Sequence, residues 1–199
     1  NTHVVVVMDV SYSMDYRGAS RDTTPLEKAR QVALGILADL KTTEADRFSL
    51  ILLTDMPNAA IGEPSSRVAL GRQIVGDAVA TDQGTSIPKT MELVRDALKK
   101  STNFTKKVFL ITDNQRHAWA VPEKERTRVA ELFKEVTDLT APNGGGIILH
   151  DVGGNVVDNV AVVDLVPAPG TKVISTDRSV EFVALLRNYG PMQVSGATM

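Results

Sequence analysis

The sequence predicts an α/β domain built on a doubly wound, mostly parallel sheet flanked by helices, followed by a short all-β segment. Three observations support this fold class. Apolar, β-branched segments alternate with segments of helical periodicity over residues 1–155. Two of the apolar segments end in an aspartate. Beyond residue 155 the apolar residues recur at a period of two, with turn signals and no helical segment.

The first half of the α/β region predicts two central strands, one helix and an edge strand. Residues Val4 to Asp9 are apolar and mostly β-branched until the last, as central parallel strands are. Asp22-Thr23-Thr24-Pro25 offers a cap and a first-turn proline for a helix that keeps its apolar spacing to about Lys41. Residues 47–54 form the next strand, and the turn-rich stretch 55–66 is expected to hold a short edge strand.

The second half of this region repeats the alternation. The expected elements are a helix at 67–79, a loop at 80–86, a helix at 87–100, a strand at 106–113, a helix from Pro122 to about Leu139 and a last strand at 146–153. Strands that alternate with helices at this spacing form right-handed crossovers, which build a Rossmann-like parallel sheet.

Residues 156–199 have the pattern of a β-sandwich, with alternating stretches separated by Pro-Gly and Asn-Tyr-Gly-Pro turns and ending in "QVSGATM". A complete sandwich of this kind takes roughly 100 residues. We therefore expect two domains, a metal-binding one at 1–155 and the start of a second at 156–199. Because the sequence opens on Asn1 directly before a strand, we also expect it to be a piece of a longer polypeptide.

Composition narrows the function classes. A net charge of −2 gives no basic footprint, so nucleic acid is not expected as a partner. The chain has no cysteine, which excludes disulfides, thiolate metal sites and a cysteine nucleophile. No apolar run approaches the roughly 20 residues that span a bilayer, so this segment is expected to make no membrane contact of its own.

Oxygen-bearing side chains gather where strands end. Asp9, Ser11 and Ser13 follow the first strand, Thr85 lies beside Gly84 just before a helix, and Asp113 closes a later strand. Ligands of open parallel sheets collect at the carboxyl ends of the strands, where such loops converge. Two carboxylates and three hydroxyls form a hard donor set that suits Mg²⁺, with Mn²⁺ or Ca²⁺ as alternatives, and disfavours Zn²⁺. The sequence predicts a divalent-cation site made of Asp9, Ser11, Ser13, Thr85 and Asp113.

The same residues resemble the metal-ion-dependent adhesion site of von Willebrand factor type A domains. "VVVVMDVSYSM", "GTSIPKTMELVRDAL" and "VFLITD" are similar to the three signature blocks of that family. The resemblance implies that the two serines and the threonine coordinate directly, that one or both aspartates act through water, and that an acidic residue of a partner protein completes the shell. It also implies no catalytic residue.

A narrower resemblance concerns two segments, residues 110–119 and 151–165. "LITDNQRHAW" and "DVGGNVVDNVAVVDL" are similar to bacterial proteins of the aerotolerance-regulator type, which are membrane-anchored. The resemblance implies a cell-envelope setting for the parent protein and an immunoglobulin-like module after residue 155. Many type A domains end in a helix that moves with the metal site, and here β-like sequence follows Gly153-Gly154 instead. An integrin-like allosteric readout is therefore not expected.

Several other polar residues have a structural and a functional interpretation. Asp15, Asp55 and Asp82 are expected to be turn or capping residues rather than ligands. His117 is expected in a solvated loop, with contact to a partner or action as a base as the alternatives. Trp119, the one tryptophan of the chain, is either a partner anchor or packed under its loop, and His150 is expected in the core or at the sheet edge.

Three functions compete at the level of sequence. The first is a binding module in which a bound divalent cation engages an acidic residue of another protein. The second is an Mg²⁺-dependent hydrolase or phosphotransfer enzyme. Against it, position 11 is a serine rather than a second carboxylate, and there is no GxxxxGK phosphate loop. The third is a structural spacer whose metal only stabilises the fold.

Overall fold

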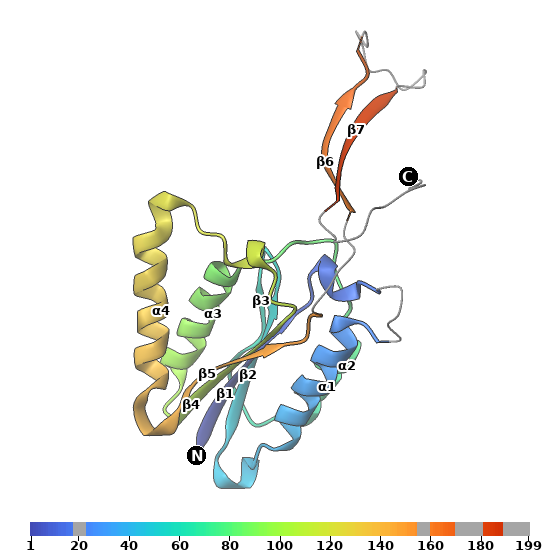
Figure 1. Ribbon diagram of the computed structural model, residues 1–199. Coiled ribbons are helices and arrows are strands. Elements are labelled where there is room, and N and C mark those ends of the chain that lie inside the picture. Colours follow the sequence, from blue (N-terminus) through green and yellow to red (C-terminus); the bar gives the residue numbers. More distant parts are fainter. Residues whose placement is uncertain (18–22, 155–159, 170–180, 189–199) are drawn as a thin grey trace. The chain divides into compact units, whose positions relative to one another are not determined.

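The computed structural model describes residues 1–17, 23–154, 160–169 and 181–188. Its residue contacts divide the chain into two compact units, 1–153 and 154–199. The first unit is a five-stranded sheet in the order β3-β2-β1-β4-β5, in which β3 alone runs antiparallel to its neighbour. The predicted doubly wound, mostly parallel fold is therefore confirmed (Figure 1).

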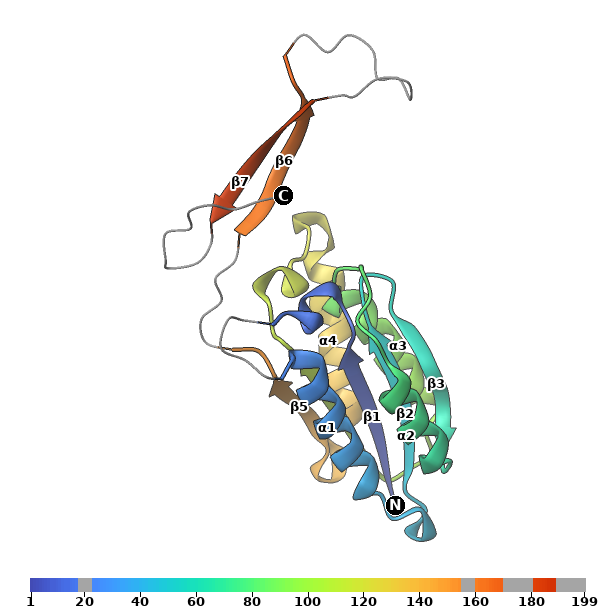
Figure 2. The same ribbon diagram turned by 90° about the vertical axis from the view of Figure 1, so that its right-hand side faces the viewer.

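The strands of the first unit are β1 (Thr2–Asp9), β2 (Arg47–Leu53), β3 (Asn58–Ser65), β4 (Thr105–Thr112) and β5 (Gly146–Asp151). Its α-helices are α1 (Pro25–Ala38), α2 (Val68–Asp77), α3 (Ile87–Lys100) and α4 (Arg126–Thr140). Short 3-10 helices lie between them: η1 (Tyr12–Asp15), η2 (Thr42–Glu44), η3 (Arg116–Trp119), η4 (Glu123–Glu125) and η5 (Pro142–Gly144). Helices α1 and α2 cover one face of the sheet, and α3 and α4 cover the other (Figures 1 and 2).

Strand β1 lies in the middle of the sheet and supplies side chains to both halves of the core. Val4, Val6 and Met8 pack in the cluster under α1, whereas Val5 and Val7 pack in the cluster under α3 and α4. This period-two alternation is what a strand covered on both faces requires. The buried valines fix the register that carries Asp9 to the carboxyl end of the sheet.

Helix α1 begins where the sequence places it but ends sooner. Thr24 closes a capping box with Glu27: the Glu27 N–H donates to Thr24 Oγ1 (3.1 Å), and the Thr24 N–H donates to Glu27 Oε2 (2.8 Å). The helix ends at Ala38, with Asp39 as its C-cap, rather than near Lys41. Apolar spacing continues to Leu40 because that side chain still packs against the core after the helix has ended.

Other boundaries also differ from the sequence prediction: α2 ends at Asp77 rather than at 79, and β5 ends at Asp151 rather than at 153. The long charged helix is split, because η4 (Glu123–Glu125) follows Pro122 and α4 itself begins at Arg126. Strand β4 ends at Thr112, so Asp113 lies one residue beyond it rather than at its end. The predicted edge strand exists as β3, which pairs antiparallel with β2 through two register irregularities. Such bulged, antiparallel pairing is common at a sheet edge.

The second unit contains a two-stranded antiparallel sheet of β6 (Val160–Pro167) and β7 (Phe182–Asn188). The predicted final stretch "QVSGATM" and most of both predicted turns lie outside the described residues. That this unit begins an immunoglobulin-like domain stays a prediction. No helix within the described ranges is long and apolar enough to cross a membrane.

Candidate metal-binding site

The residues predicted to bind a cation lie on segments that the structure brings to the carboxyl end of the parallel strands. Asp9 is the last residue of β1, and in Figure 2 the arrowhead of this strand leads into the short helix η1, which carries Ser13 and is preceded by Ser11. Asp113 directly follows β4, which pairs with β1. Thr85 lies in the loop before α3.

Asp9 is fully buried, and each of its carboxylate oxygens accepts one hydrogen bond. The Ser11 N–H donates to Oδ1 (2.9 Å), and the Thr112 hydroxyl donates to Oδ2 (2.6 Å). Burial raises the pKa of the Asp9 carboxyl, and the charge of Asp113 acts in the same direction, whereas the hydrogen bonds from Thr112 and Ser11 oppose the shift. Each oxygen keeps a further lone pair that a cation or a water could use.

No described lysine, arginine or histidine forms an ion pair with Asp9 or Asp113. A buried carboxylate without a cation is costly, because the protein interior solvates charge poorly. The two carboxylates therefore form an acidic pair that a divalent cation would neutralise. This observation fits the cation that the donor set predicts.

The two serines lie next to each other and next to Asp9. Their hydroxyl oxygens are 3.3 Å apart, which is within hydrogen-bonding distance. Backbone bonds join this segment to the loop that carries Thr85: the Thr81 N–H donates to the Val10 carbonyl (2.8 Å) and the Tyr12 N–H to the Gln83 carbonyl (2.9 Å). Two chain segments about 70 residues apart in sequence are thus held together beside Asp9.

Thr85 and Asp113 each contact a residue of the loop that follows β4. Thr85 Oγ1 lies 3.4 Å from His117 Nε2, and Gln115 Nε2 donates to Asp113 Oδ2 (2.8 Å). The structure therefore places all five predicted residues on adjoining loops of one sheet edge. Their direct contacts link Asp9, Ser11 and Ser13, whereas Thr85 and Asp113 are held by their own neighbours.

A cavity of about 240 Å³ opens among these loops. Ser11 and Ser13 line it on one side, Asp82, Gln83 and Gly84 on another, and Tyr12, Gln115 and His117 complete the wall. Three quarters of the Tyr12 side chain is exposed. Of the five predicted residues only Ser11 and Ser13 line this cavity, whereas Asp9, Thr85 and Asp113 are not among its lining residues.

Sequence reasoning assigned no role in the site to Thr112 or to Gln115. Thr112 is fully buried in β4 and donates the shortest hydrogen bond that Asp9 accepts, but a threonine inside a strand has no signal that separates it from other β-branched residues. Gln115 follows the strand by three residues, and only the loop conformation brings its amide to Asp113.

The structure also shows where the other polar and aromatic residues considered in the sequence lie. Asp15, Asp55 and Asp82 are exposed, and of these Asp82 alone lines the cavity. His117 is exposed, as expected of a loop histidine, and also touches Thr85. Trp119 is 39 % exposed and its ring stacks on Phe133 of α4, with centroids 6.4 Å apart, so packing accounts for much of its surface.

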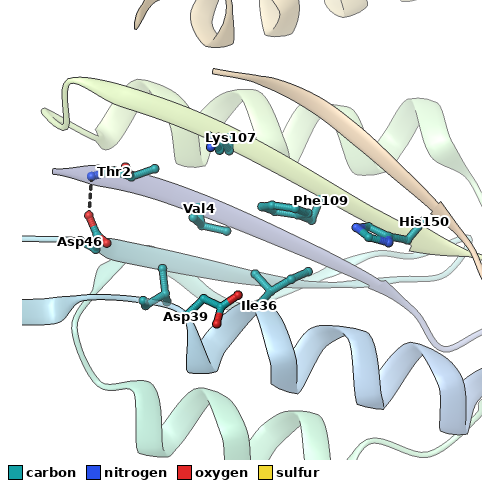
Figure 3. Close-up of a pocket in the computed structure, with 9 residues that line it drawn as sticks. Thr2, Val4, Ile36, Asp39, Asp46, Lys107, Phe109 and His150 are labelled. Atoms are coloured by element: carbon teal, nitrogen blue, oxygen red, sulfur yellow. Dashed lines mark hydrogen bonds between the residues drawn. The ribbon is translucent and has the colours of Figure 1, made fainter. Parts of the chain in front are cut away.

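A second cavity, of about 420 Å³, lies on the α1 face of the sheet away from these loops (Figure 3). None of the five predicted residues lines it. Phe109 and His150 stack in its wall with ring centroids 5.8 Å apart, which places His150 at the edge strand β5. At the other end of the cavity the Thr2 N–H donates to Asp46 (2.7 Å). This cavity is therefore distinct from the predicted cation site.

Among the described residues, no three histidine, aspartate or glutamate side chains form a group that could hold a metal. A cation at the carboxyl edge would thus depend on hydroxyl oxygens as well as on the two carboxylates. This is the donor set of a hard, oxygen-liking ion.

The fold and this edge define a type A adhesion-like domain, a Rossmann-like sheet with serines, threonine and aspartates at its carboxyl end. The model of the von Willebrand factor type A domain family matches residues 4–115, which is more than half of the chain. The chain belongs to that family, and the resemblance seen in the sequence is confirmed. No curated protein matches it.

Solved structures share the fold at low sequence identity. BatB from Bacteroides thetaiotaomicron, described as a conserved hypothetical protein, has a TM-score of 0.59 at 17% identity over 93% of this chain and 80% of its own. An aerotolerance-related membrane protein from Bacteroides fragilis has a TM-score of 0.58 at 16% identity over 93% of this chain and 81% of its own. A type A domain protein from Catenulispora acidiphila has a TM-score of 0.53 at 14% identity, covering 100% of this chain and 52% of its own.

Proposed function

We propose that this domain is a divalent-cation-dependent protein-binding module, and that Mg²⁺ held by Asp9, Ser11, Ser13, Thr85 and Asp113 engages an acidic residue of a partner protein. Family membership supports a protein-interaction role. Mn²⁺ and Ca²⁺ accept the same oxygen ligands and are the alternative ions. When bound, the cation would supply a positive centre with one open coordination position. The five residues would hold the ion, and the surrounding loops would shape the approach of the partner's carboxylate.

The observation that carries the proposal is the buried Asp9 carboxylate, which accepts hydrogen bonds from Ser11 and Thr112 and lies beside Asp113 without a described cationic side chain. Such an acidic pair costs free energy until a cation binds. The serine hydroxyls beside it offer neutral oxygens, so the site would hold two negative charges against the two positive charges of the ion. A partner's carboxylate could then join at modest electrostatic cost.

The setting of the parent protein is part of this proposal. The three similar structures are of bacterial origin, and one of them is described as an aerotolerance-related membrane protein. We propose that the present domain also belongs to a membrane-anchored protein of the cell envelope. The segment at 156–199 would then begin an immunoglobulin-like domain.

Calorimetric titration of the chain with Mg²⁺ tests the proposal directly. We expect one binding site in the wild-type chain and no detectable binding in Asp9→Ala, with Asp15→Ala as a matched control because Asp15 is exposed and lies on the same short helix as Ser13. Unchanged Mg²⁺ binding in Asp9→Ala would refute the assignment of the site.

Two further measurements separate the module from its competitors. Turnover of phosphate esters with Mg²⁺, lost in Asp9→Ala, would favour the enzyme. A melting temperature that depends on Mg²⁺, together with no EDTA-sensitive binding to any protein of the cell envelope, would favour the spacer. The binding module predicts EDTA-sensitive capture of a partner that also fails with Asp9→Ala.

A further inference from the structure

The loop after β4 contacts the candidate site through a residue outside the predicted ligand set. Gln115 Nε2 donates to Asp113 Oδ2 (2.8 Å), and no described residue donates to the other oxygen, Oδ1. Gln115 also lines the cavity shared by Ser11 and Ser13. We propose that Gln115 is a positioning residue, whose amide fixes the Asp113 carboxylate so that Oδ1 stays free to serve the cation directly or through water. This inference rests on the proposed function, because it concerns the same site.

The backbone beside Gln115 is held by hydrogen bonds on both sides. Asn114 adopts a left-handed conformation (φ 55°), and its N–H donates to Thr112 Oγ1 (3.2 Å). The same Thr112 hydroxyl donates to Asp9, so a chain of hydrogen bonds runs from the loop to the buried carboxylate. The loop conformation and the Asp9 environment are therefore linked through one threonine.

The far end of the loop is anchored to the body of the domain. Trp119 Nε1–H donates to Asn114 Oδ1 (3.0 Å), and the Trp119 ring stacks on Phe133 of α4. Ala118, between His117 and Trp119, is 1% exposed and belongs to the core cluster under α3 and α4. Because both ends are fixed, the amide of Gln115 is held at Asp113 by a preorganised loop.

His117 provides an internal comparison. It approaches Thr85 at 3.4 Å, at the long end of the hydrogen-bond range, and its side chain is exposed. The Gln115 contact is shorter and goes to a charged group, and such bonds are the stronger kind. Groups that orient a metal ligand are worth about 10- to 100-fold in metal affinity. We expect a loss near the lower bound, about tenfold, when the Gln115 amide is removed.

The test uses the whole 199-residue chain and Mn²⁺ as the probe, because Mn²⁺ accepts oxygen ligands and is visible by electron paramagnetic resonance. Gln115→Met keeps the length of the side chain and removes its donor, and Gln115→Ala removes both. We expect each variant to weaken Mn²⁺ binding about tenfold and to change the low-temperature spectrum of bound Mn²⁺. Arg116→Lys is the matched control, because Arg116 is an exposed residue of the same loop that does not line the cavity, and it should leave both the affinity and the spectrum unchanged. Melting in EDTA is expected to be the same for all four proteins.

Each outcome bears on the proposal. Wild-type affinity and an unchanged spectrum in Gln115→Met would overturn the positioning role while leaving the proposed function intact. Equal losses in Gln115→Met and in the Arg116→Lys control, or losses accompanied by a lower melting temperature in EDTA for both Gln115 variants, would show a structural role and also overturn it. Absence of Mn²⁺ binding to the wild-type chain would overturn both the proposed function and this inference.

Discussion

His3 makes the stability of the domain depend on pH in a way that can be calculated. The side chain is fully buried, its Nε2 lies 3.1 Å from Ser49 Oγ, and its Nδ1 is the one buried side-chain nitrogen or oxygen in the described part of the chain that lacks a hydrogen-bond partner. Burial and then the charge of Lys106 lower its pKa from 6.5 to about 4. Protonation would place a positive charge on a buried ring whose Nδ1–H has no acceptor for a hydrogen bond.

The sign and size of the effect follow from proton linkage. Between pH 6.5 and 4 the unfolded chain binds a proton at His3 that the folded domain excludes, so stability is full above pH 6.5 and falls as the pH is lowered to about 4. Each pH unit of this window corresponds to about 1.4 kcal/mol. We therefore expect the titration of His3 to lower the free energy of unfolding by about 3 kcal/mol as the pH falls from 6.5 to 4.

Urea unfolding of the wild-type chain and of His3→Gln at several pH values measures the contribution of His3 to the pH dependence of stability. Glutamine is close to histidine in size, can bond to Ser49 and does not titrate, so the difference between the two proteins isolates His3 from every other group. We expect the difference in unfolding free energy to change by about 3 kcal/mol between pH 7.5 and pH 4. A difference that stays constant, or an NMR titration of His3 with a midpoint above pH 6, would refute the reasoning.

Three further predictions concern packing, capping and the metal. A Cβ at Gly71 would lie 2.6 Å from the fully buried ring of Phe48, so Gly71→Ala should lower the free energy of unfolding by about 1–3 kcal/mol, whereas Gly76→Ala, with open space in the same helix, should raise it by about 0.5–1 kcal/mol. Urea unfolding distinguishes the two, and equal effects would contradict the packing argument. Thr24→Ala removes the capping box of α1 and should cost about 1 kcal/mol in the same assay. Asp9→Asn removes a buried charge, so in EDTA it should melt no lower than the wild type. It should, however, lose the stabilisation by Mg²⁺, which for the wild type is about 2.7 kcal/mol at an Mg²⁺ concentration of 100 times the dissociation constant. An Mg²⁺ shift retained in Asp9→Asn would contradict the proposed role of Asp9.

Much of the fold could be predicted because burial on both faces of a sheet leaves a strong pattern. The run from Val4 to Met8 has few alternatives to a central strand, and Pro25 and Ile87 begin helices where their caps indicate. Where prediction failed, local geometry overrode the pattern. Leu40 continues the apolar spacing beyond the end of α1 because a side chain can pack on the core without being helical.

The positions of the candidate site residues could be predicted for the same reason. The pairing of Met8 with Ile111 places the end of β1 beside the end of β4, so Asp9 and Asp113 had to lie near each other once the strand order was known. Thr85 required only that its loop reach the same edge. Two backbone hydrogen bonds hold that loop there, one from the Thr81 N–H to the Val10 carbonyl and one from the Tyr12 N–H to the Gln83 carbonyl. That these residues bind a cation stays a prediction.

Gln115 could not be found in this way, because its place depends on a single backbone conformation rather than on a periodic pattern. Asn114 adopts a left-handed conformation two residues after the end of β4, and its side chain accepts a hydrogen bond from Trp119. A loop without this bond could place Gln115 in solvent while leaving Asp113 where it is. The sheet thus determines which oxygens meet at the edge, and the loop determines how one of them is presented. It follows that exchanging Gln115 alone should alter cation affinity without altering the fold.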